Sequence, residues 1–217
     1  MIRAFLFDLD GVLTDTSEFH FLAWKRLAEE NGILFTWQDN EALRGVSRRE
    51  SLELMLKGRP VNEEQAKAMM DLKNGYYLKL VRKMTPDDLL PGAKEILEEL
   101  GNLKLKRVIV SASKNASLVI ERLCIAALID GVVDGTSPAR SKPAPDLFLL
   151  AAKKYGLEPA DCLVVEDATA GVEAAHAAGM RAVGLGPIER VGAAELVLPS
   201  LEGQRASDII SRIENIG

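Results

Sequence analysis

The sequence predicts an α/β fold, with a Rossmann-like parallel sheet as its core and an inserted α-helical cap domain. From Pro91 onward, short apolar runs alternate with amphipathic segments, which is the pattern of repeated strand–helix–strand units. A further apolar run lies at residues 4–7, and the region between carries helical periodicity without a convincing strand. We therefore expect a core of residues 1–15 and 87–217 and a cap of residues 16–86.

The first strand is expected at residues 4–7, where four apolar side chains are followed by Asp8 and Gly11. A continuous apolar run of this kind is typical of a parallel strand that is buried on both faces. Asp8 would then lie at the carboxyl end of the strand.

Three helical segments are expected in the cap. Apolar side chains recur at helical spacing from Phe19 to Leu27, and Gly32 ends this first segment. The second segment covers residues 40–57 with an interruption near Gly45, and the third covers residues 62–84.

The rest of the core alternates between the two element types. We expect helices at 93–100, 116–124, 145–155 and 170–178, strands at 107–111, 132–133, 163–165 and 182–184, and a terminal helix from Ser207. Open parallel sheets bind ligands beyond the carboxyl ends of their strands. Asp8, Ser111, Glu166 and Asp167 all fall at such ends, so they are the first candidates for a site.

Composition favours a small-molecule partner. The chain has 217 residues, of which 47% are hydrophobic, and a formal net charge of −5. It therefore has the means to bury a core but lacks a broad cationic surface for nucleic acid or an anionic membrane. Cys124 and Cys162 form neither a disulfide framework nor a zinc motif, and no apolar stretch has membrane-spanning length. We expect a cytoplasmic monomer.

Asp8 and Asp10 place two carboxylates where the first strand ends, and Gly11 permits a tight backbone turn beside them. One carboxylate can attack a phosphoryl group while the other moves a proton, provided that the phosphate charge is neutralised. Mg²⁺ would neutralise it, held by Asp8, the main-chain carbonyl of Asp10, and Glu166 with Asp167. A solvated turn is the alternative for the pair alone.

Two other segments suit phosphate binding. Ser111 follows a strand and begins a turn into a helix, where hydroxyls and free N–H groups can bind an anion. Lys142 lies in a loop stiffened by two prolines, which would hold its charge in place. An ordinary helix cap and a surface lysine are the alternatives.

These four motifs, in this order, resemble the haloacid dehalogenase superfamily of phosphotransferases. The resemblance implies that Asp8 is phosphorylated and that Asp10 is the general acid/base. It also implies that Ser111, Ala112 and Lys142 bind the transferring phosphoryl group, and that the metal site consists of Asp8, Asp10, Glu166 and Asp167.

The cap segments resemble those of the phosphosugar mutases in this superfamily. The resemblance implies interconversion of β-D-glucose 1-phosphate and glucose 6-phosphate through an aspartyl-phosphate enzyme and glucose 1,6-bisphosphate. It further implies that the following residues bind substrate: Thr16, His20, Trp24, Lys25, Gly45, Val46, Arg48, Ser51, Lys73, Ser113, Lys114 and Asn115.

Physical reasoning supports some of these roles. A bisphosphate has a second phosphate far from Asp8, and Arg48 offers planar bidentate binding for it. His20 has the reach to hydrogen-bond Asp10, and Trp24 offers a flat face to a sugar. Taken singly, His20 fits a helix surface, Trp24 a packed core, and Lys25 a surface charge.

Two rival functions remain open at this point. One is a sugar-phosphate phosphatase of the same fold, and the other is a regulatory module that binds phosphosugars without turnover. The hinges of the cap are expected at residues 14–16 and near Asp87, and Arg140 has no assigned role.

Overall fold

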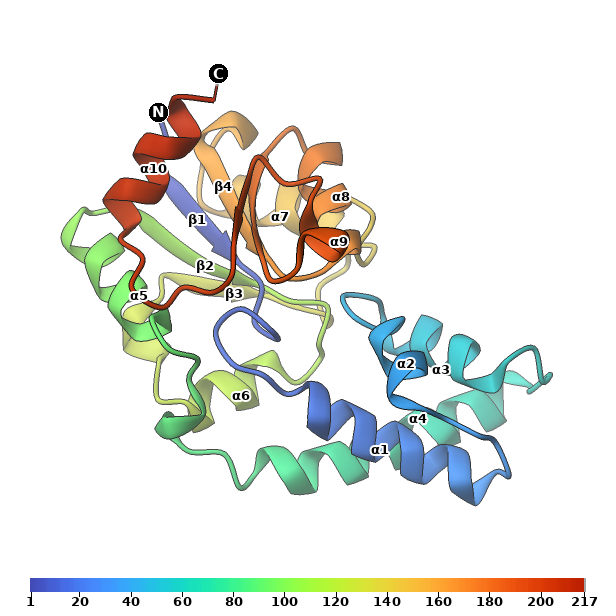
Figure 1. Cartoon of the computed structure of the whole chain (residues 1–217). Coiled ribbons are helices and arrows are strands. Elements are labelled where there is room, and N and C mark those ends of the chain that lie inside the picture. Colours follow the sequence, from blue (N-terminus) through green and yellow to red (C-terminus); the bar gives the residue numbers. More distant parts are fainter. Residues whose placement is uncertain (217) are drawn as a thin grey trace.

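The computed structural model describes residues 1–216 and confirms the predicted fold class. A six-stranded parallel sheet has the order β3-β2-β1-β4-β5-β6 (Figure 1). Its strands are β1 (Ala4–Phe7), β2 (Lys106–Val110), β3 (Gly131–Val133), β4 (Cys162–Glu166), β5 (Arg181–Leu185) and β6 (Leu196–Leu198). The strand order changes direction at β1, which is the position where such sheets bind ligands.

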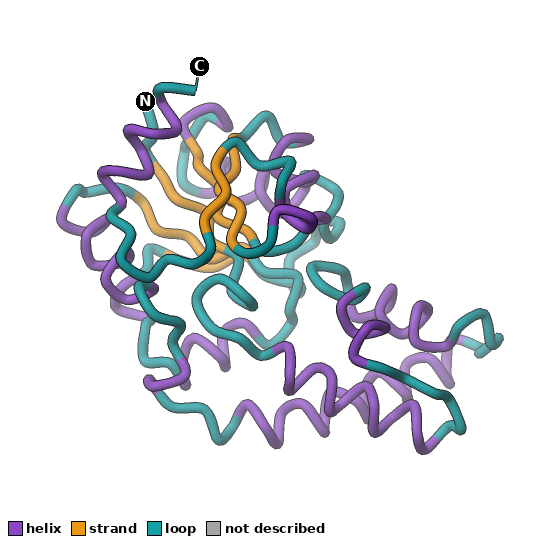
Figure 2. The backbone as a smooth tube through the Cα atoms, viewed as in Figure 1, coloured by secondary structure: helices purple, strands orange, loops and turns teal. Residues whose placement is uncertain are grey.

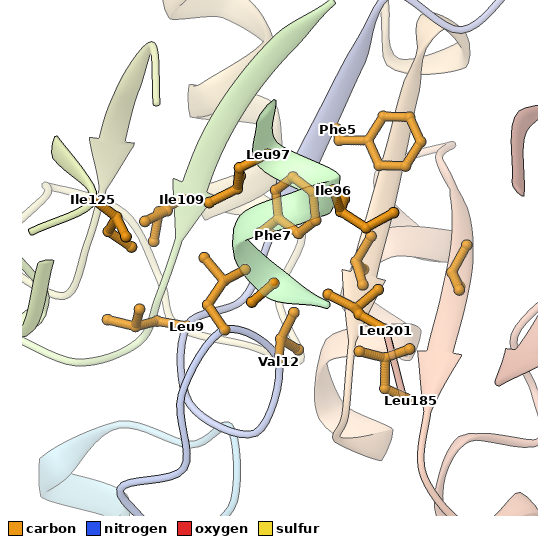
Figure 3. Close-up of a cluster of buried hydrophobic side chains, with 14 of the residues drawn as sticks. Phe5, Phe7, Leu9, Val12, Ile96, Leu97, Ile109, Ile125, Leu185 and Leu201 are labelled. Carbon is orange, nitrogen blue, oxygen red and sulfur yellow. The ribbon is translucent and has the colours of Figure 1, made fainter. Parts of the chain in front are cut away.

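Alternate side chains of β1 enter two different hydrophobic clusters, one on each face of the sheet. Phe5 and Phe7 pack with α5 (Ala93–Asn102), α6 (Ala116–Arg122) and α10 (Ala206–Glu214). Ala4 and Leu6 pack with α7 (Asp146–Lys154), α8 (Thr169–Ala177) and α9 (Ile188–Val191). Figure 3 shows the first cluster, with Phe7 close to Ile96 and Leu97 of α5. The central strand is thus buried on both faces, and its carboxyl end is held rigidly.

Four helices follow β1 before the chain returns to the sheet: α1 (Ser17–Glu30), α2 (Trp37–Glu41), α3 (Arg48–Leu56) and α4 (Glu63–Val81). They project to one side of the core, and Figure 2 shows helices and loops but no strand among them. Their outer parts enclose a separate cluster that includes Trp24, Leu27, Leu52 and Met55. The parts of α1 and α4 nearer the sheet instead contribute to the core cluster.

The two chain segments that connect cap and core are hydrogen-bonded to each other. The Thr14 hydroxyl donates to the Asp88 carbonyl at 2.7 Å, and the Leu90 N–H donates to the Leu13 carbonyl at 2.9 Å. Asp88 ends a short 3-10 helix, Pro86–Asp88. The exact domain limits and the hinge role of these segments stay predictions.

The prediction of one interrupted helix at 40–57 was wrong in its limits. The structure has two helices here, because Thr36 starts α2 with a capping box to Asp39 and Ser47 starts α3 by accepting from the Glu50 N–H. The prediction also missed α9, β6 and two more 3-10 helices, Ala126–Leu128 and Pro159–Asp161. These elements are too short for hydrophobic periodicity to reveal. Within residues 1–216, no helix has the length and apolar character needed to cross a membrane.

Candidate active site

Asp8 lies directly after β1, in the middle of the sheet, and its side chain is buried. Its N–H donates to the Val165 carbonyl of β4 at 2.9 Å, so the residue is fixed to the neighbouring strand. Ser111 follows β2, and Glu166 and Asp167 lie at and after the end of β4. The structure therefore brings together the strand ends that the sequence singled out.

Lys142 is buried behind Asp8 and contacts two carboxylates. Its Nζ donates to Asp8 Oδ1 at 2.5 Å, to the Val110 carbonyl at 2.9 Å, and to Glu166. Burial acts against its charge, but Asp8 and Glu166 more than offset this and raise the pKa of Lys142 above its usual value. Lys142 is therefore a permanent cation beside the candidate nucleophile.

Glu166 is held from several sides. Its Oε2 accepts from the N–H groups of Asp167 and Ala168 at 3.1 and 3.2 Å. Gly171, in the first turn of α8, leaves room for it, since a Cβ at that position would lie 1.9 Å from the Glu166 carboxyl carbon. A side chain held this way presents its carboxylate in one orientation.

Asp8, Glu166 and Asp167 form a buried carboxylate cluster, each with an oxygen within 4.8 Å of the others. Burial, and after it the nearby Asp8 carboxylate, raise the pKa of Asp167 to about 7. Carboxylate oxygens gathered in this way are the donors that a hard divalent cation prefers. The donor set fits a cation such as Mg²⁺.

Asp10 accepts a hydrogen bond from the Thr16 hydroxyl, and the Tyr77 hydroxyl donates in turn to Thr16 at 3.3 Å. Burial and the Asp8 carboxylate raise the pKa of Asp10 to about 7. A carboxyl group with such a pKa can both take up and release a proton near neutral pH. Thr16, rather than His20 as expected, is the hydrogen-bond partner of Asp10.

His20 instead contacts Lys73 of α4, with His20 Nδ1 2.8 Å from Lys73 Nζ. The ammonium nitrogen also lies over the rings of Trp24 and Tyr77, at 4.7 and 4.9 Å from their centroids. Burial and the nearby Arg48 hold the pKa of Lys73 well below its usual value, and burial and Lys73 do the same for His20. The aromatic rings position both groups at the cleft.

A cleft lies between cap and core, and residues of both domains line it. The predicted residues that line it are Asp8, Asp10, His20, Trp24, Gly45, Val46, Arg48, Ser51, Lys73, Ser111, Ala112, Ser113, Lys114, Asn115 and Asp167. Cap and core side chains thus meet around one space.

Asn74 of α4 connects the two sides of the cleft. Its Oδ1 accepts from Arg48 Nη2 at 2.9 Å and from Asn115 Nδ2 at 2.8 Å. Within the core loop, the Ser113 N–H donates to Ser111 Oγ and the Asn115 N–H to Ser113 Oγ, both at 3.1 Å. These bonds shape the turn that leads into α6.

Four predicted residues lie outside the cleft lining. Thr16, Lys142 and Glu166 are buried, Thr16 donates to Asp10, and Lys142 contacts both Asp8 and Glu166. Lys25 is 46% exposed and pairs with Glu29 at 3.9 Å, so the structure does not bring it to the site. Its role in substrate binding stays a prediction. Arg140, left unassigned, pairs with Asp146 at the start of α7 at 2.9 Å.

Sequence reasoning missed four residues that line the cleft: Ser17, Asn40, Leu43 and Arg44. Arg44 contacts Asp167 Oδ2 at 3.0 Å. Its position next to Gly45, a glycine already expected near the ligand, was the one signal available.

Comparison with known proteins agrees with this geometry. Residues 2–179 match the family model of the haloacid dehalogenase-like hydrolases. β-Phosphoglucomutase of Bacillus subtilis (strain 168) is 45% identical over 202 residues, which are 91% of this chain and 89% of that protein. The crystal structure of β-phosphoglucomutase from Clostridium difficile has a TM-score of 0.95 and 37% identity, and covers 99% of this chain and 98% of its own.

A phosphatase is similar at a lower level. The phosphorylated carbohydrates phosphatase of Thermotoga maritima is 28% identical over 187 residues, 84% of each chain. The family match, the identity and the superposition agree over most of the chain. The chain belongs to the haloacid dehalogenase-like hydrolase family, in the branch that contains the β-phosphoglucomutases.

Proposed function

We propose that this chain is a phosphosugar mutase that interconverts β-D-glucose 1-phosphate and glucose 6-phosphate, with glucose 1,6-bisphosphate as the intermediate. One observation carries the proposal: Asp8 and Asp10 line the same cleft as Arg48 and Lys73 of the cap. Such a cleft offers a nucleophile, a proton carrier and, in Arg48, a cation for a second phosphate. The similarity to β-phosphoglucomutases supports the reaction type.

In the first half-reaction, phospho-Asp8 transfers its phosphoryl group to the sugar 6-hydroxyl. The bond between phosphorus and the Asp8 carboxylate breaks, a bond to the sugar oxygen forms, and Asp10 takes the hydroxyl proton. The Lys142 ammonium, 2.5 Å from Asp8 Oδ1, stabilises the carboxylate that is released.

In the second half-reaction, the bisphosphate presents its 1-phosphate to Asp8. The Asp8 carboxylate attacks that phosphorus, the bond to the sugar oxygen breaks, and Asp10 returns its proton to the leaving oxygen. Glucose 6-phosphate and phospho-Asp8 result. Because the pKa of Asp10 is raised to about 7, by burial first, it suits both directions of transfer.

The other site residues bind and orient the substrate in this proposal. Ser111, Ala112 and Lys142 surround the transferring phosphoryl group, and Arg48 holds the distal phosphate. Asp8, Asp10, Glu166 and Asp167 would hold Mg²⁺, which supplies positive charge to the phosphoryl group during transfer. The buried carboxylate cluster supports this metal site.

The alternative is a sugar-phosphate phosphatase, and the similarity to the Thermotoga maritima phosphatase supports it. Chemistry at Asp8 is common to both enzymes, since water or a sugar hydroxyl can accept the phosphoryl group. The cap decides between them, because its cations favour a sugar carrying a second phosphate and its closure excludes water.

The test supplies β-D-glucose 1-phosphate, Mg²⁺ and a trace of glucose 1,6-bisphosphate, and measures glucose 6-phosphate and free phosphate separately. We expect glucose 6-phosphate in large excess over phosphate, and neither product from Asp10→Asn. Free phosphate without isomerisation would establish the phosphatase instead, and binding without turnover would establish a regulatory module.

A further inference from the structure

Four charged residues form a ring across the boundary between cap and core. Glu41 and Arg44 belong to the cap, at the end of α2 and in the loop after it, whereas Asp167 and Arg190 belong to the core. Arg44 Nη1 lies 3.0 Å from Asp167 Oδ2, and Arg190 Nη1 lies 3.5 Å from Glu41 Oε2. Each domain thus offers one acid and one base to the other.

The ring also closes within each domain. Arg44 forms a two-pronged pair with Glu41, at 2.9 and 3.2 Å. Arg190 Nε donates to the Asp167 carbonyl at 2.6 Å, and its Nη2 lies 3.9 Å from Asp167 Oδ2. Arg44 and Asp167 are mostly buried, while Glu41 and Arg190 keep about a third of their side chains exposed.

Backbone packing places the ring in a fixed register. Gly45 has a φ of +74°, and a Cβ at that position would lie 3.2 Å from the Ala168 side chain. The cap loop therefore rests directly on the turn after β4, and the residue that precedes each contact residue, Arg44 before Gly45 and Asp167 before Ala168, belongs to the ring.

We propose that Glu41, Arg44, Asp167 and Arg190 form an ionic latch, with Arg44 as the positioning residue that binds Asp167 when the cap closes. When the cap opens, the Arg44–Glu41 and Arg190–Asp167 pairs persist inside their own domains. Opening therefore leaves none of the four charges without a partner. It avoids the large free-energy cost of a buried charge that has lost its ion pair. The latch selects one closed register and still releases readily.

Reversible closure of this kind suits a reaction in which an intermediate must reorient between two phosphoryl transfers, and to that extent the inference rests on the proposed function. Closure itself does not depend on the reaction. The latch is therefore tested by the distance between cap and core, which no loss of turnover can imitate.

The experiment places two dyes on exposed positions, by Leu54→Cys in α3 and Leu149→Cys in α7, with the exposed Cys124 replaced by serine. Energy transfer then reports the ratio of open to closed molecules at low salt and in 1 M KCl. Partly exposed ion pairs contribute modestly, so we expect Arg44→Gln to raise this ratio about three- to five-fold at low salt. Salt should raise it in the parent and raise it less in the variant, which keeps only the Arg190–Glu41 pair across the boundary, because salt screens the pairs.

Three further variants sharpen the result. Glu41→Gln should raise the ratio as Arg44→Gln does, and Arg44→Lys, which keeps the charge, should recover most of the closed state. Arg49→Gln is the matched control, because Arg49 pairs with Glu53 and Glu63 inside the cap. Circular dichroism checks that each variant is folded.

The latch is wrong if Arg44→Gln and Glu41→Gln keep the ratio and the salt response of Arg49→Gln. Product analysis of the same proteins separates the two proposals. If the variants that open more often release more free phosphate per glucose 6-phosphate, both proposals are supported. If the parent protein closes in a salt-dependent way but makes no glucose 6-phosphate, the latch stands and the mutase proposal is wrong.

Discussion

Individual side chains in the cleft have separable tasks, and Arg48 allows the clearest test. It donates to Asn74 at 2.9 Å, and in our proposal it holds the phosphate that is far from Asp8. A charged hydrogen bond contributes about 1.5–3 kcal/mol. We expect Arg48→Ala to reduce isomerisation by roughly 10- to 100-fold, while hydrolysis of acetyl phosphate at Asp8, which needs no distal phosphate, changes little.

Arg49→Ala is the control, since this neighbouring arginine pairs with glutamates on the cap surface. Both rates are measured on the same preparations. Equal losses in the two reactions for Arg48→Ala would remove the residue from the distal-phosphate site.

Asp167 makes a second residue-scale prediction, on stability and pH. Burial and the nearby Asp8 raise its pKa from 3.8 to about 7. A carboxyl whose pKa is higher in the folded state binds its proton more tightly there. The free energy of unfolding therefore falls as the pH rises from about 3.8 to about 7. We expect Asp167→Asn to raise the free energy of unfolding of the metal-free protein by about 1–3 kcal/mol at pH 8 and little at pH 4.

Urea unfolding at both pH values, with and without Mg²⁺, measures this effect. Mg²⁺ should stabilise the parent and not the variant, if Asp167 holds the ion. Glu173→Gln, an exposed change on α8, should alter neither comparison. A variant that is less stable than the parent at pH 8 without metal would contradict the prediction.

At the scale of elements, the start of α8 supports Glu166. Gly171 lies where a Cβ would be 1.9 Å from the Glu166 carboxyl carbon, and Lys142 prevents that carboxylate from moving away. We expect Gly171→Ala to destabilise the protein by about 1–3 kcal/mol and to lower activity, despite the better helix propensity of alanine. Thermal unfolding and the mutase assay measure the two effects.

Gly75 provides a matched control within α4. A Cβ there would meet nothing within 4 Å, so Gly75→Ala should stabilise the protein by roughly 0.5–1 kcal/mol. Opposite signs for the two substitutions are expected. The same sign would show that the close approach at Gly171 is unimportant.

Elements of ordinary length were predictable because their apolar patterns follow directly from burial. The run at β1 is buried on both faces, and its two side-chain sets enter the two clusters. α2 and β6 were not, since five and three residues carry too little periodicity. In α2, the capping box at Thr36 was a local signal that could have shown the start of the helix.

Some residues of the site were likewise predictable from the sequence and others were not. Strand ends identified Asp8, Ser111, Glu166 and Asp167 because parallel strands converge at one edge of the sheet. The Thr16–Asp10 bond and the His20–Lys73 contact depend on how α1 and α4 pack, which no sequence spacing specifies. Arg44 was missed for the same reason, because its partner Asp167 lies 123 residues away and across the domain boundary.

At the scale of the molecule, the cap and the core have separate hydrophobic clusters, and α1 and α4 contribute side chains to both. Leu52 lies in the cap cluster and Leu97 in the core cluster, and both are fully buried. Replacing either leucine with alanine should lower the stability of its own cluster by about 2–5 kcal/mol. The consequences differ, because the cap is inserted into the core and both its connections come from the core.

We expect Leu52→Ala to speed amide exchange in α3 and the outer parts of α1 and α4, while the strands keep their protection. Leu97→Ala should speed exchange everywhere, since loss of the sheet also releases both cap connections. Exchange measured segment by segment, alongside circular dichroism, distinguishes the two patterns. Faster exchange throughout the chain after Leu52→Ala would instead mean that cap and core unfold as one cooperative unit. The cap would then have no stability of its own, and it could not move as an independent domain when the cleft closes.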